Sequence, residues 1–237
     1  MSSALVGIAP IDRKETLGVL VREKLRAALM AGRFRAGEKL TIRAVASALD
    51  VSLTPAREAL YNLVAEGALE SGPNGTIFIP QLDEERIVEL RKIRIALEGL
   101  AAREAARRLT DAQVAELAAI NAALVEADRR KEYSELMRHN WQFHFGIYEA
   151  AAMPTLERMI ESCWLKMGSY LNVIYPRYGE TGKGLELHGK VLEALQRRDA
   201  DALCQAIRAD IEQSTAYLIA MTRGPEPSIG ARSSGDA

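Results

Sequence analysis

Two histidines and two oxygen-bearing side chains in the second half of the chain are spaced so that they can meet inside a helical bundle. Asn140 and His144 are four residues apart, which places them on one face of a helix. His188 and Asp210 each lie 11 residues from a predicted turn at Asp199. In an antiparallel helix pair rising about 1.5 Å per residue, this spacing puts both side chains at nearly the same height. Two imidazoles, a carboxylate and an amide suit a divalent ion such as Zn, Ni, Mn or Fe.

The same residues also fit a site without a metal. Aromatic neighbours in the segment 140–144 indicate burial, and a buried histidine is more often part of a hydrogen-bonded polar cluster than a metal ligand. His139 stands roughly 140° round the helix from His144, so we interpret it as a surface residue. Arg94 lies on an apolar helix face, where pairing with Glu98 is one common fate for an arginine.

In the first half of the chain, the segment Val51–Leu60 predicts a helix that reads DNA. It follows a short amphipathic stretch and a tight connection through Asp50, as in a helix-turn-helix. Thr54 and Arg57 stand three residues apart and therefore share a helix face. Arg43, in the preceding stretch, is placed to reach the phosphate backbone or a base edge. The alternative is a small three-helix domain whose arginines are merely solvated.

A predicted hairpin after this helix favours the DNA-reading interpretation. Strand-like pieces over 68–70 and 76–79 flank a glycine-rich connection over 71–75. Asn74 and Gly75 fall at its tip, where a wing enters or straddles the minor groove. Three helices followed by this hairpin make a winged helix-turn-helix.

Periodicity and capping residues define the helices that carry these side chains. Apolar residues at three- and four-residue spacing predict an amphipathic helix over Leu17–Ala31. A turn over 35–38 leads to a short second helix, which Thr41 caps. Ser52 or Thr54 caps the third helix, the one that would read DNA.

From residue 84 onwards the pattern is helical, without a strand signal. Asp83 caps the first of these helices, a capping box over 110–113 starts the second, and Asp199 caps the last. The predicted helices cover 84–109, a stretch starting at 111, 133–151, 154–175, 185–197 and 200–221, with a loop over 176–184. The sequence therefore predicts a mainly α protein: a winged helix-turn-helix over 10–80, an antiparallel all-α bundle over 84–222, and a disordered tail over 223–237.

Composition sets the broad class of protein. The chain has 237 residues, 48% of them hydrophobic and 27% charged, which suits two globular domains. Residues 1–80 carry a net charge of +2 and the remainder −3, so charge alone does not decide whether DNA is bound. No apolar run approaches the ~18 residues of a membrane span, and the amino terminus lacks the pattern of a secretory signal. We expect a cytoplasmic protein in which Cys163 and Cys204 are reduced and buried.

The stretch from Gly32 to Gly75 closely resembles the winged-helix domain of the GntR family of bacterial transcription regulators. The matching residues are Gly32-x4-Gly37-x2-Leu40, Val45-Ala46-x2-Leu49-x-Val51-Ser52-x-Thr54-Pro55-x-Arg57-Glu58-Ala59-Leu60 and Leu63-x2-Glu66-Gly67, with Gly75 in the wing. The resemblance implies that Arg43, Ser52, Thr54, Arg57 and Gly75 touch DNA.

Leu53 departs from this pattern, because the family often has arginine at the matching position. A leucine side chain cannot donate a hydrogen bond to guanine or phosphate, although it can pack on a thymine methyl group. We therefore expect Leu53 to lie at the DNA surface and to give a shifted or weaker operator preference.

Residues 85–221 resemble the FCD-type effector domain of the FadR branch of the same family. The first helix carries the family's Arg-x2-Leu-Glu pattern as Arg94-Ile95-Ala96-Leu97-Glu98. Many members hold a divalent metal between an Asp and a His four residues apart and two further histidines from the last two helices. Metal and a carboxylate ligand often bind together there.

By this resemblance, Arg94, Asn140, His144 and His188 contact a small organic or sugar acid, and Asn140, His144, His188 and Asp210 hold a metal. Two ligand positions depart from the family, since Asn140 replaces an Asp and Asp210 replaces a His. One imidazole is lost, so metal affinity is expected to fall.

The leading hypothesis is a ligand-responsive transcription regulator that binds a palindromic operator in double-stranded DNA as a homodimer, joined through the helical domains. One alternative is a metal-responsive regulator, in which the ion itself is the signal. A metalloenzyme that uses the two histidines is a third interpretation, but the sequence places no general base or nucleophile beside them.

Overall fold

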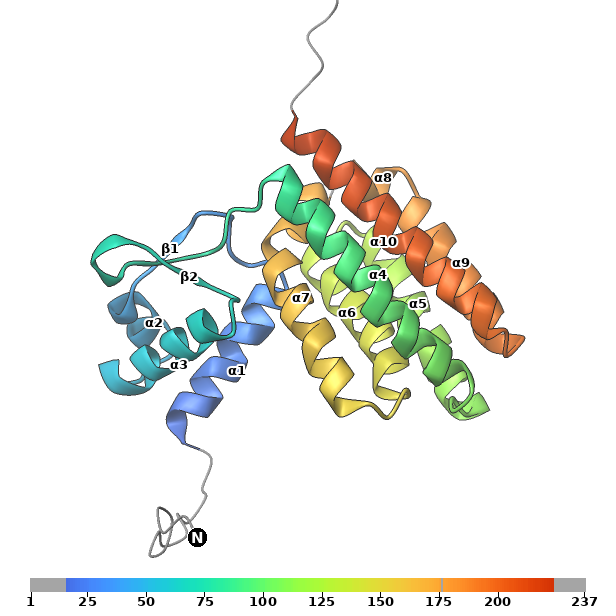
Figure 1. The fold of residues 1–237 in the computed structure, drawn as a ribbon, viewed down its shortest axis with the longest axis horizontal. Helices are drawn as coiled ribbons and strands as arrows, with labels where there is room; N and C mark the ends of the chain where they lie inside the picture. Colours follow the sequence, from blue (N-terminus) through green and yellow to red (C-terminus); the bar gives the residue numbers. More distant parts are fainter. Residues whose placement is uncertain (1–15, 176, 224–237) are drawn as a thin grey trace, which may run out of the picture.

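The computed structural model describes residues 16–175 and 177–223, which form a small winged-helix unit beside a larger helical bundle (Figure 1). Residues 10–15, which the sequence assigned to the first domain, and the tail 224–237 lie outside the described residues. Within the described residues, no helix combines the length and the apolar character that a membrane span needs.

The winged-helix unit consists of three helices and a small antiparallel sheet whose strand order is β1-β3-β2. Thr41 caps the second helix as predicted, since its hydroxyl accepts the Ala44 N–H at 3.1 Å. Ser52 occupies the N-cap position of the third helix without a side-chain bond. The elements are α1 (Leu17–Met30), β1 (Lys39–Leu40), α2 (Ile42–Ala48), α3 (Leu53–Ala65), β2 (Glu70–Ser71) and β3 (Ile77–Phe78).

Strand β1 corrects the sequence prediction, which placed only a turn before the second helix. Lys39 pairs with Phe78, and Leu40 with Ile77. Two residues are too few to show the alternation that reveals a strand in sequence. The start of the hairpin also moves: the backbone N–H groups of Ala68 and Leu69 bond the carbonyl of Leu63 and finish α3, so that β2 begins only at Glu70.

The helical bundle follows the predicted order, with one added helix. Asp83, Thr110 and Asp199 all cap helices as expected, and Thr110 forms the predicted capping box with Gln113. The segment predicted as a loop contains α8, a short helix that places the side chain of Tyr178 in the interior. The helices are α4 (Glu84–Ala106), α5 (Asp111–Arg129), α6 (Tyr133–Glu149), α7 (Pro154–Ile174), α8 (Arg177–Glu180), α9 (Lys183–Gln196) and α10 (Ala200–Thr222).

Two smaller expectations also change. Arg223, which the sequence assigned to the tail, ends α10 and forms an ion pair with Glu84 at the start of α4. Both cysteines are free thiols, but only Cys163 is buried, while Cys204 is half-buried.

Helix α7 is the main contact between the bundle and the winged-helix unit. Its Gly168 packs against the backbone of Leu29 in α1, and its Glu161 binds Arg26 of α1 at 2.5 Å. The Tyr170 hydroxyl, also in α7, accepts the backbone N–H of Leu82 in the connector between the two units. The winged-helix unit therefore contacts the bundle mainly through one helix, α7 (Figure 1).

Candidate functional site

The start of α3 presents its polar side chains to the exterior. Ser52, Thr54 and Arg57 are all exposed, whereas Pro55 and Ala56 are buried against the rest of the unit. This division follows from helical periodicity, because residues on opposite sides of one turn face opposite environments. Leu53 is 46% exposed in the same turn, so an apolar side chain stands where a guanidinium would otherwise face outwards.

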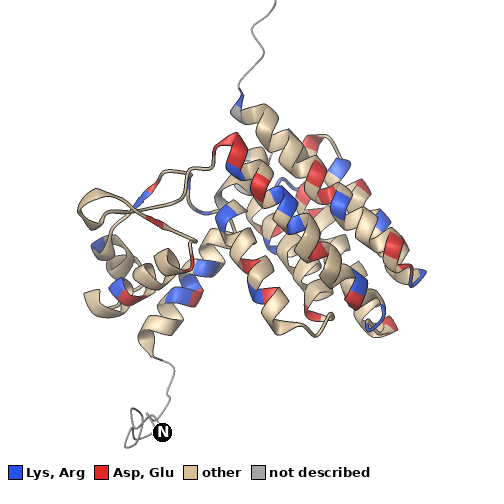
Figure 2. Cartoon of the chain, viewed as in Figure 1, with Lys and Arg blue, Asp and Glu red and all other residues tan. Residues whose placement is uncertain are grey.

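Two arginines near this surface have no internal partner. Among the described residues, neither Arg43 on α2 nor Arg57 on α3 makes an ion pair or a side-chain hydrogen bond. In contrast, Arg22 and Arg26 of α1 both bind Glu66. Acidic and basic residues are otherwise interspersed over the molecule (Figure 2). The unpaired guanidiniums are therefore available for an external anion such as phosphate.

The wing tip has the geometry of a tight, exposed turn. Asn74 and Gly75 adopt left-handed φ angles of 61° and 69°, and both are exposed. Asn tolerates this conformation better than most residues, and Gly adopts it freely. Tyr61 on α3 is 46% exposed, and its hydroxyl would lie 3.7 Å from a Cβ at position 75. Tyr61 is not among the residues predicted from the sequence, since an exposed tyrosine in a helix carries no periodic signal.

Three of the four expected metal ligands converge inside the bundle. His144 Nε2 lies 3.2 Å from His188 Nε2 and 3.3 Å from Asp210 Oδ2. His144 and His188 are 1% and 2% exposed. The three come from α6, α9 and α10, and the predicted turn at Asp199 brings the last two helices together. One ligand atom from each residue lies within 4.8 Å of the others.

The outer nitrogens of both imidazoles are held by hydrogen bonds. His188 Nδ1 donates to Asn121 Oδ1 at 3.2 Å. The Tyr148 hydroxyl donates to Glu98 at 2.5 Å, so its oxygen is left to accept from His144 Nδ1 at 3.2 Å. When both imidazoles are neutral, with their protons on the Nδ1 atoms, each Nε2 presents a lone pair to the centre. Such outer bonds commonly fix the tautomer of a metal-binding histidine.

Burial controls the charges at this cluster. It lowers the pKa of His188 to about 4, although the Asp210 carboxylate opposes the shift. Burial alone would raise the pKa of Asp210, but when His144 is protonated and donates to the carboxylate through Nε2, this hydrogen bond and charge bring the pKa of Asp210 below its ordinary value. Burial and the neighbouring Glu98 hold the pKa of Tyr148 well above its usual range, which keeps the hydroxyl protonated. The centre thus combines neutral His188 with an ionised carboxylate.

Glu98 joins this cluster to Arg94. Its carboxylate accepts from Arg94 Nε at 2.6 Å and from Trp164 Nε1 at 3.1 Å. Arg94 is 3% exposed and lies over the Trp164 ring, 4.8 Å from its centroid. The pairing of Arg94 with Glu98 that the sequence suggested is therefore present.

Tyr148 and Asn121 belong to this cluster but were not predicted from the sequence. Tyr148 is four residues after His144 and could have been found by helical spacing. Asn121 comes from a different helix and could not.

The hollow beside this cluster is small. Arg94, Asn140, His188 and Asp210 all line it, and its volume is about 20 Å³. A space of this size holds a water molecule or an ion, but not an organic acid. Tyr178 also lines it, and the Tyr178 hydroxyl is buried without a hydrogen-bond partner among the described residues.

His139 is not the plain surface residue that the helical angle suggested. It is half-buried, with Nδ1 enclosed and unpaired and Nε2 at 3.0 Å from Arg138 Nη2. It takes no part in the histidine cluster.

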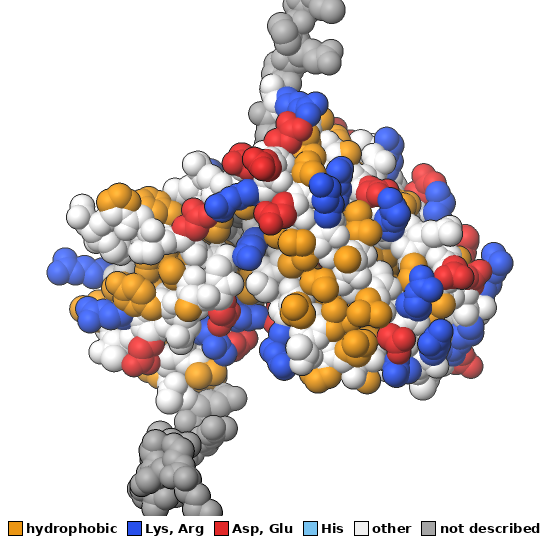
Figure 3. Space-filling model, in the orientation of Figure 1, with side chains coloured by type: hydrophobic (Ala, Val, Ile, Leu, Met, Phe, Trp, Pro, Cys, Tyr) orange, Lys and Arg blue, Asp and Glu red, His pale blue; other side chains and the backbone are white. Residues whose placement is uncertain are grey.

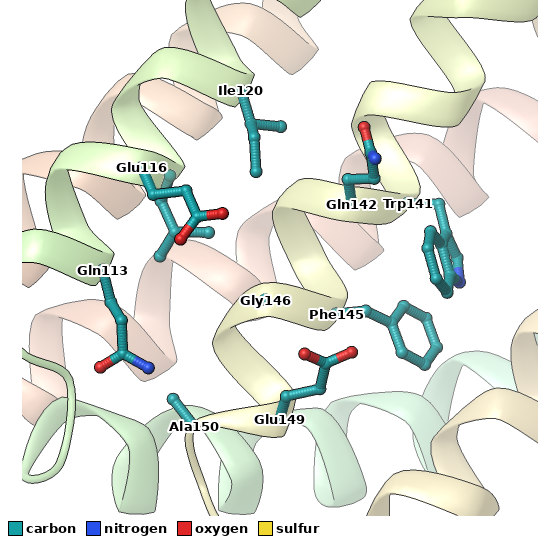
Figure 4. A pocket seen from close by; sticks show the side chains of 10 residues that line it. Gln113, Glu116, Ile120, Trp141, Gln142, Phe145, Gly146, Glu149 and Ala150 are labelled. Carbon is teal, nitrogen blue, oxygen red and sulfur yellow. The ribbon is translucent and has the colours of Figure 1, made fainter.

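The larger hollows lie elsewhere. One is a groove of about 380 Å³ between α5 and α6, into which Glu116 and Glu149 point (Figure 4). Burial raises the pKa of Glu149, and repulsion from Glu157 and Glu116 adds to the shift. None of the candidate effector residues lines this groove.

Family models match both parts of this architecture. Residues 18–79 match the model of the bacterial regulatory proteins of the gntR family, and residues 89–213 match the FCD domain. The chain belongs to the GntR family of bacterial regulators. Its FCD domain places it in the FadR branch.

Individual relatives agree over most of the chain. The HTH-type transcriptional regulator McbR of Escherichia coli is 29% identical over 205 residues, covering 86% of this chain and 93% of McbR. The Nta operon transcriptional regulator of Aminobacter aminovorans is 28% identical, covering 85% and 94% of the two chains. The solved structure of E. coli McbR/YncC superimposes with a TM-score of 0.83 at 28% identity, covering 88% of this chain and all of that one.

These relatives and domains are transcription regulators and not enzymes. The metalloenzyme interpretation of the two histidines is therefore set aside. GntR regulators bind operator DNA.

Proposed function

We propose that this protein is a cytoplasmic, ligand-responsive transcription regulator that binds operator DNA through α3 and the wing. The observation that carries the proposal is the exposed first turn of α3, where Thr54 and Arg57 face outwards and the Arg57 guanidinium has no partner among the described residues. Ser52 and Arg43 flank this turn, and both donate hydrogen bonds of the kind that phosphates and base edges accept. Asn74 and Gly75 supply the minor-groove contact.

Binding of DNA from the chromosome region around the protein's own gene tests this proposal. The full-length protein should retard a duplex from that region at a concentration at which unrelated duplexes of equal length stay free. The affinity should fall steeply with added salt, because bound phosphates release counterions. Equal affinity for all duplexes would overturn the proposal.

We further propose that the active form is a homodimer joined through α4 and α7. Apolar side chains gather on the face formed by these helices (Figure 3). Ile93 and Leu100 of α4 are 39% and 43% exposed, and Met159 of α7 is 53% exposed. Large apolar patches on a soluble protein commonly mark an interface. A twofold dimer would present two recognition helices to a palindromic operator.

The donor atoms of the bundle support a divalent metal. A tetrahedral ion with bonds of about 2.0–2.1 Å holds its ligand atoms about 3.3 Å apart, and the two measured separations at His144 Nε2 are 3.2 and 3.3 Å. Two lone pairs and a carboxylate oxygen at this spacing repel one another unless a cation or proton lies among them. His144, His188 and Asp210 would hold the ion, with Asn140 in the adjacent wall. Zn, Ni, Mn and Fe all accept this donor set.

A small organic or sugar acid is the proposed effector in the same region. Arg94, Asn140 and His188 line one hollow, with His144 at its metal side. The acid would have to enlarge this hollow and take over part of the bonding of Arg94, which Glu98 now satisfies. The short helix α8 carries Tyr178 over the hollow, so displacement of this segment would provide the space.

The size of the hollow also supports a second candidate function. A volume of about 20 Å³ admits an ion without rearrangement. In that case the metal itself would be the signal. DNA binding measured with and without a chelator, in the absence of any organic acid, separates the two proposals: a metal sensor responds to the chelator alone.

Helix α7 offers a path from either signal to the DNA reader. Its Trp164 binds Glu98, which also bonds Tyr148 and Arg94. The same helix contacts α1 through Glu161 and Gly168. A ligand that shifts α7 would move the winged-helix unit and change the half-site spacing that a dimer can match.

A further inference from the structure

A separate cavity lies between the two domains. Its walls are Ala27 and Met30 of α1, Met137 and Trp141 of α6, and Glu161 of α7. Its volume is about 250 Å³. None of the residues of the histidine cluster lines it. Ligand sites commonly form at domain interfaces of this kind.

The cavity is suited to a small, mainly apolar molecule. Two methionines and the Trp141 ring are among its lining residues, and methionine side chains adapt to ligands of varied shape. An apolar cavity of about 150 Å³ is enough to admit benzene. A space of about 250 Å³ therefore admits a single aromatic ring with one short substituent.

The charged residues around the cavity neutralise one another. Arg26 is bound by Glu66 and Glu161, and Arg138 is bound by Glu135. Glu23, which also lines the cavity, pairs with Arg22. No unpaired charge is left among the described lining residues, so a neutral ligand is favoured over an organic ion.

Two hydrogen-bond donors in these walls have no acceptor among the described residues. They are Arg26 Nε and Trp141 Nε1, both enclosed. Glu23 lies 3.8 Å from Arg26 Nε, beyond hydrogen-bond distance. Figure 4 shows the indole nitrogen of Trp141 on the edge of the ring turned away from Glu116 and the outer groove. A buried donor without a partner carries a free-energy cost that an added acceptor removes.

We propose that this interdomain cavity is a second ligand site, which takes a small neutral aromatic molecule bearing a carbonyl or similar oxygen acceptor. The ring packs against Met30, Met137 and Trp141. A small displacement of the Trp141 or Arg26 side chain exposes its enclosed donor, and the oxygen then accepts from Trp141 Nε1 or Arg26 Nε. Since α1 belongs to the DNA reader and α6 and α7 to the effector domain, an occupant contacts both domains at once. The site depends neither on the metal nor on the acid effector.

Acetophenone and α-methylstyrene form a suitable probe pair, because they differ mainly in a carbonyl oxygen replaced by a CH₂ group. The chain contains two tryptophans, so a ¹⁵N–¹H spectrum of the full-length protein shows two indole resonances. Trp164 donates to Glu98 and serves as the internal control. Acetophenone should shift the Trp141 resonance and leave that of Trp164 in place. The Trp141→Phe variant assigns the two signals.

Affinities from these titrations decide the proposal. Acetophenone should bind about fivefold more tightly than α-methylstyrene, the ratio that corresponds to one hydrogen bond of about 1 kcal/mol. Ala27→Leu fills the cavity and should abolish binding of both probes. Ala119→Leu adds the same bulk to an exposed position on α5 and should change neither.

Three results would overturn the proposal. They are an unmoved Trp141 resonance up to the solubility limit of acetophenone, equal affinities for the two probes, and undiminished binding to Ala27→Leu. Trp141→Phe adds a further check, since it should weaken acetophenone binding, measured on the probe's own signals, more than it weakens that of α-methylstyrene.

Discussion

Gly168 of α7 lies so close to Leu29 of α1 that a Cβ at position 168 would come within 2.2 Å of the Leu29 carbonyl oxygen. No side chain separates the two helices at this point. The ion pair between Arg26 and Glu161 lies on the same interface. Because α7 also carries Trp164, which binds Glu98 in the bundle interior, the winged-helix unit is packed directly on a helix that contacts the candidate effector site.

Gly168→Ala should therefore destabilise the protein. The added methyl group overlaps a backbone atom that cannot rotate away, so the helices must separate, at a cost of about 1–3 kcal/mol. Denaturant unfolding measures the change. Gly189→Ala in α9 is the matched control, since a Cβ there meets nothing within 4 Å, and helix propensity should make it neutral or slightly stabilising. Equal stabilities for the two variants would refute the close contact.

Leu53→Arg should strengthen DNA binding. The side chain is exposed in the first turn of α3, and an arginine there adds a contact to phosphate or guanine. In titrations at several salt concentrations, the slope of log K against log salt should steepen by about 0.9 for each new phosphate contact. Val125→Arg adds the same charge to an exposed position of α5. If both variants steepen the slope alike, only net charge has been altered.

Elements with local signals, such as caps and apolar periodicity, are predictable from the sequence. The run Val51–Leu60 carries a cap and an apolar periodicity, and α3 begins at Leu53, directly after the expected cap Ser52. Strand β1 was not predicted, because the pairing of Lys39 with Phe78 depends on the folded sheet and leaves no pattern in a two-residue segment. Helix α8 was missed for a similar reason, since four residues in a glycine-rich stretch give no period.

In the candidate metal centre, too, some residues could be predicted from sequence spacing and others could not. Because His188 and Asp210 are equally far from the turn at Asp199, the sequence predicted that they lie at the same level of the antiparallel helix pair. In the structure both belong to the same cluster. Asn121, which orients His188, could not be found in this way, because it belongs to another helix and its contact depends on packing. The small volume of the hollow likewise depends on how Tyr178 packs, which no spacing rule describes.

Charges placed on the α4–α7 face should break the proposed dimer. Leu100→Glu and Ile93→Glu put a carboxylate into a surface that we expect to be buried, where an unpaired charge is costly. Sedimentation velocity should show monomers for these variants and dimers for the natural protein. Val125→Glu is the control, because Val125 is 43% exposed on α5, away from this face. Dimers in all four samples would place the interface elsewhere.

Metal removal should lower the thermal stability of the protein. An ion present at about 100 times its Kd adds about 2.7 kcal/mol to the free energy of unfolding, so chelation should lower Tm and Zn²⁺ should restore it. His144→Ala should abolish this response. His139→Ala, a neighbouring half-buried histidine outside the cluster, should retain it. A Tm that is insensitive to both chelator and Zn²⁺ would show that the cluster binds no metal and is held by hydrogen bonds alone.

The affinity of Arg57→Ala for operator DNA tests the central claim most directly. Fluorescence anisotropy of a labelled duplex from the upstream region gives this affinity for the natural protein, for the variant and for Arg208→Ala. Arg208 is exposed on α10 and pairs with Glu212, so its loss removes the same charge far from α3. Arg57→Ala should lose about 1–3 kcal/mol of binding free energy for each recognition helix, with an unchanged unfolding curve, while Arg208→Ala binds normally. An unchanged affinity for Arg57→Ala would contradict the assignment of α3 as the element that reads DNA.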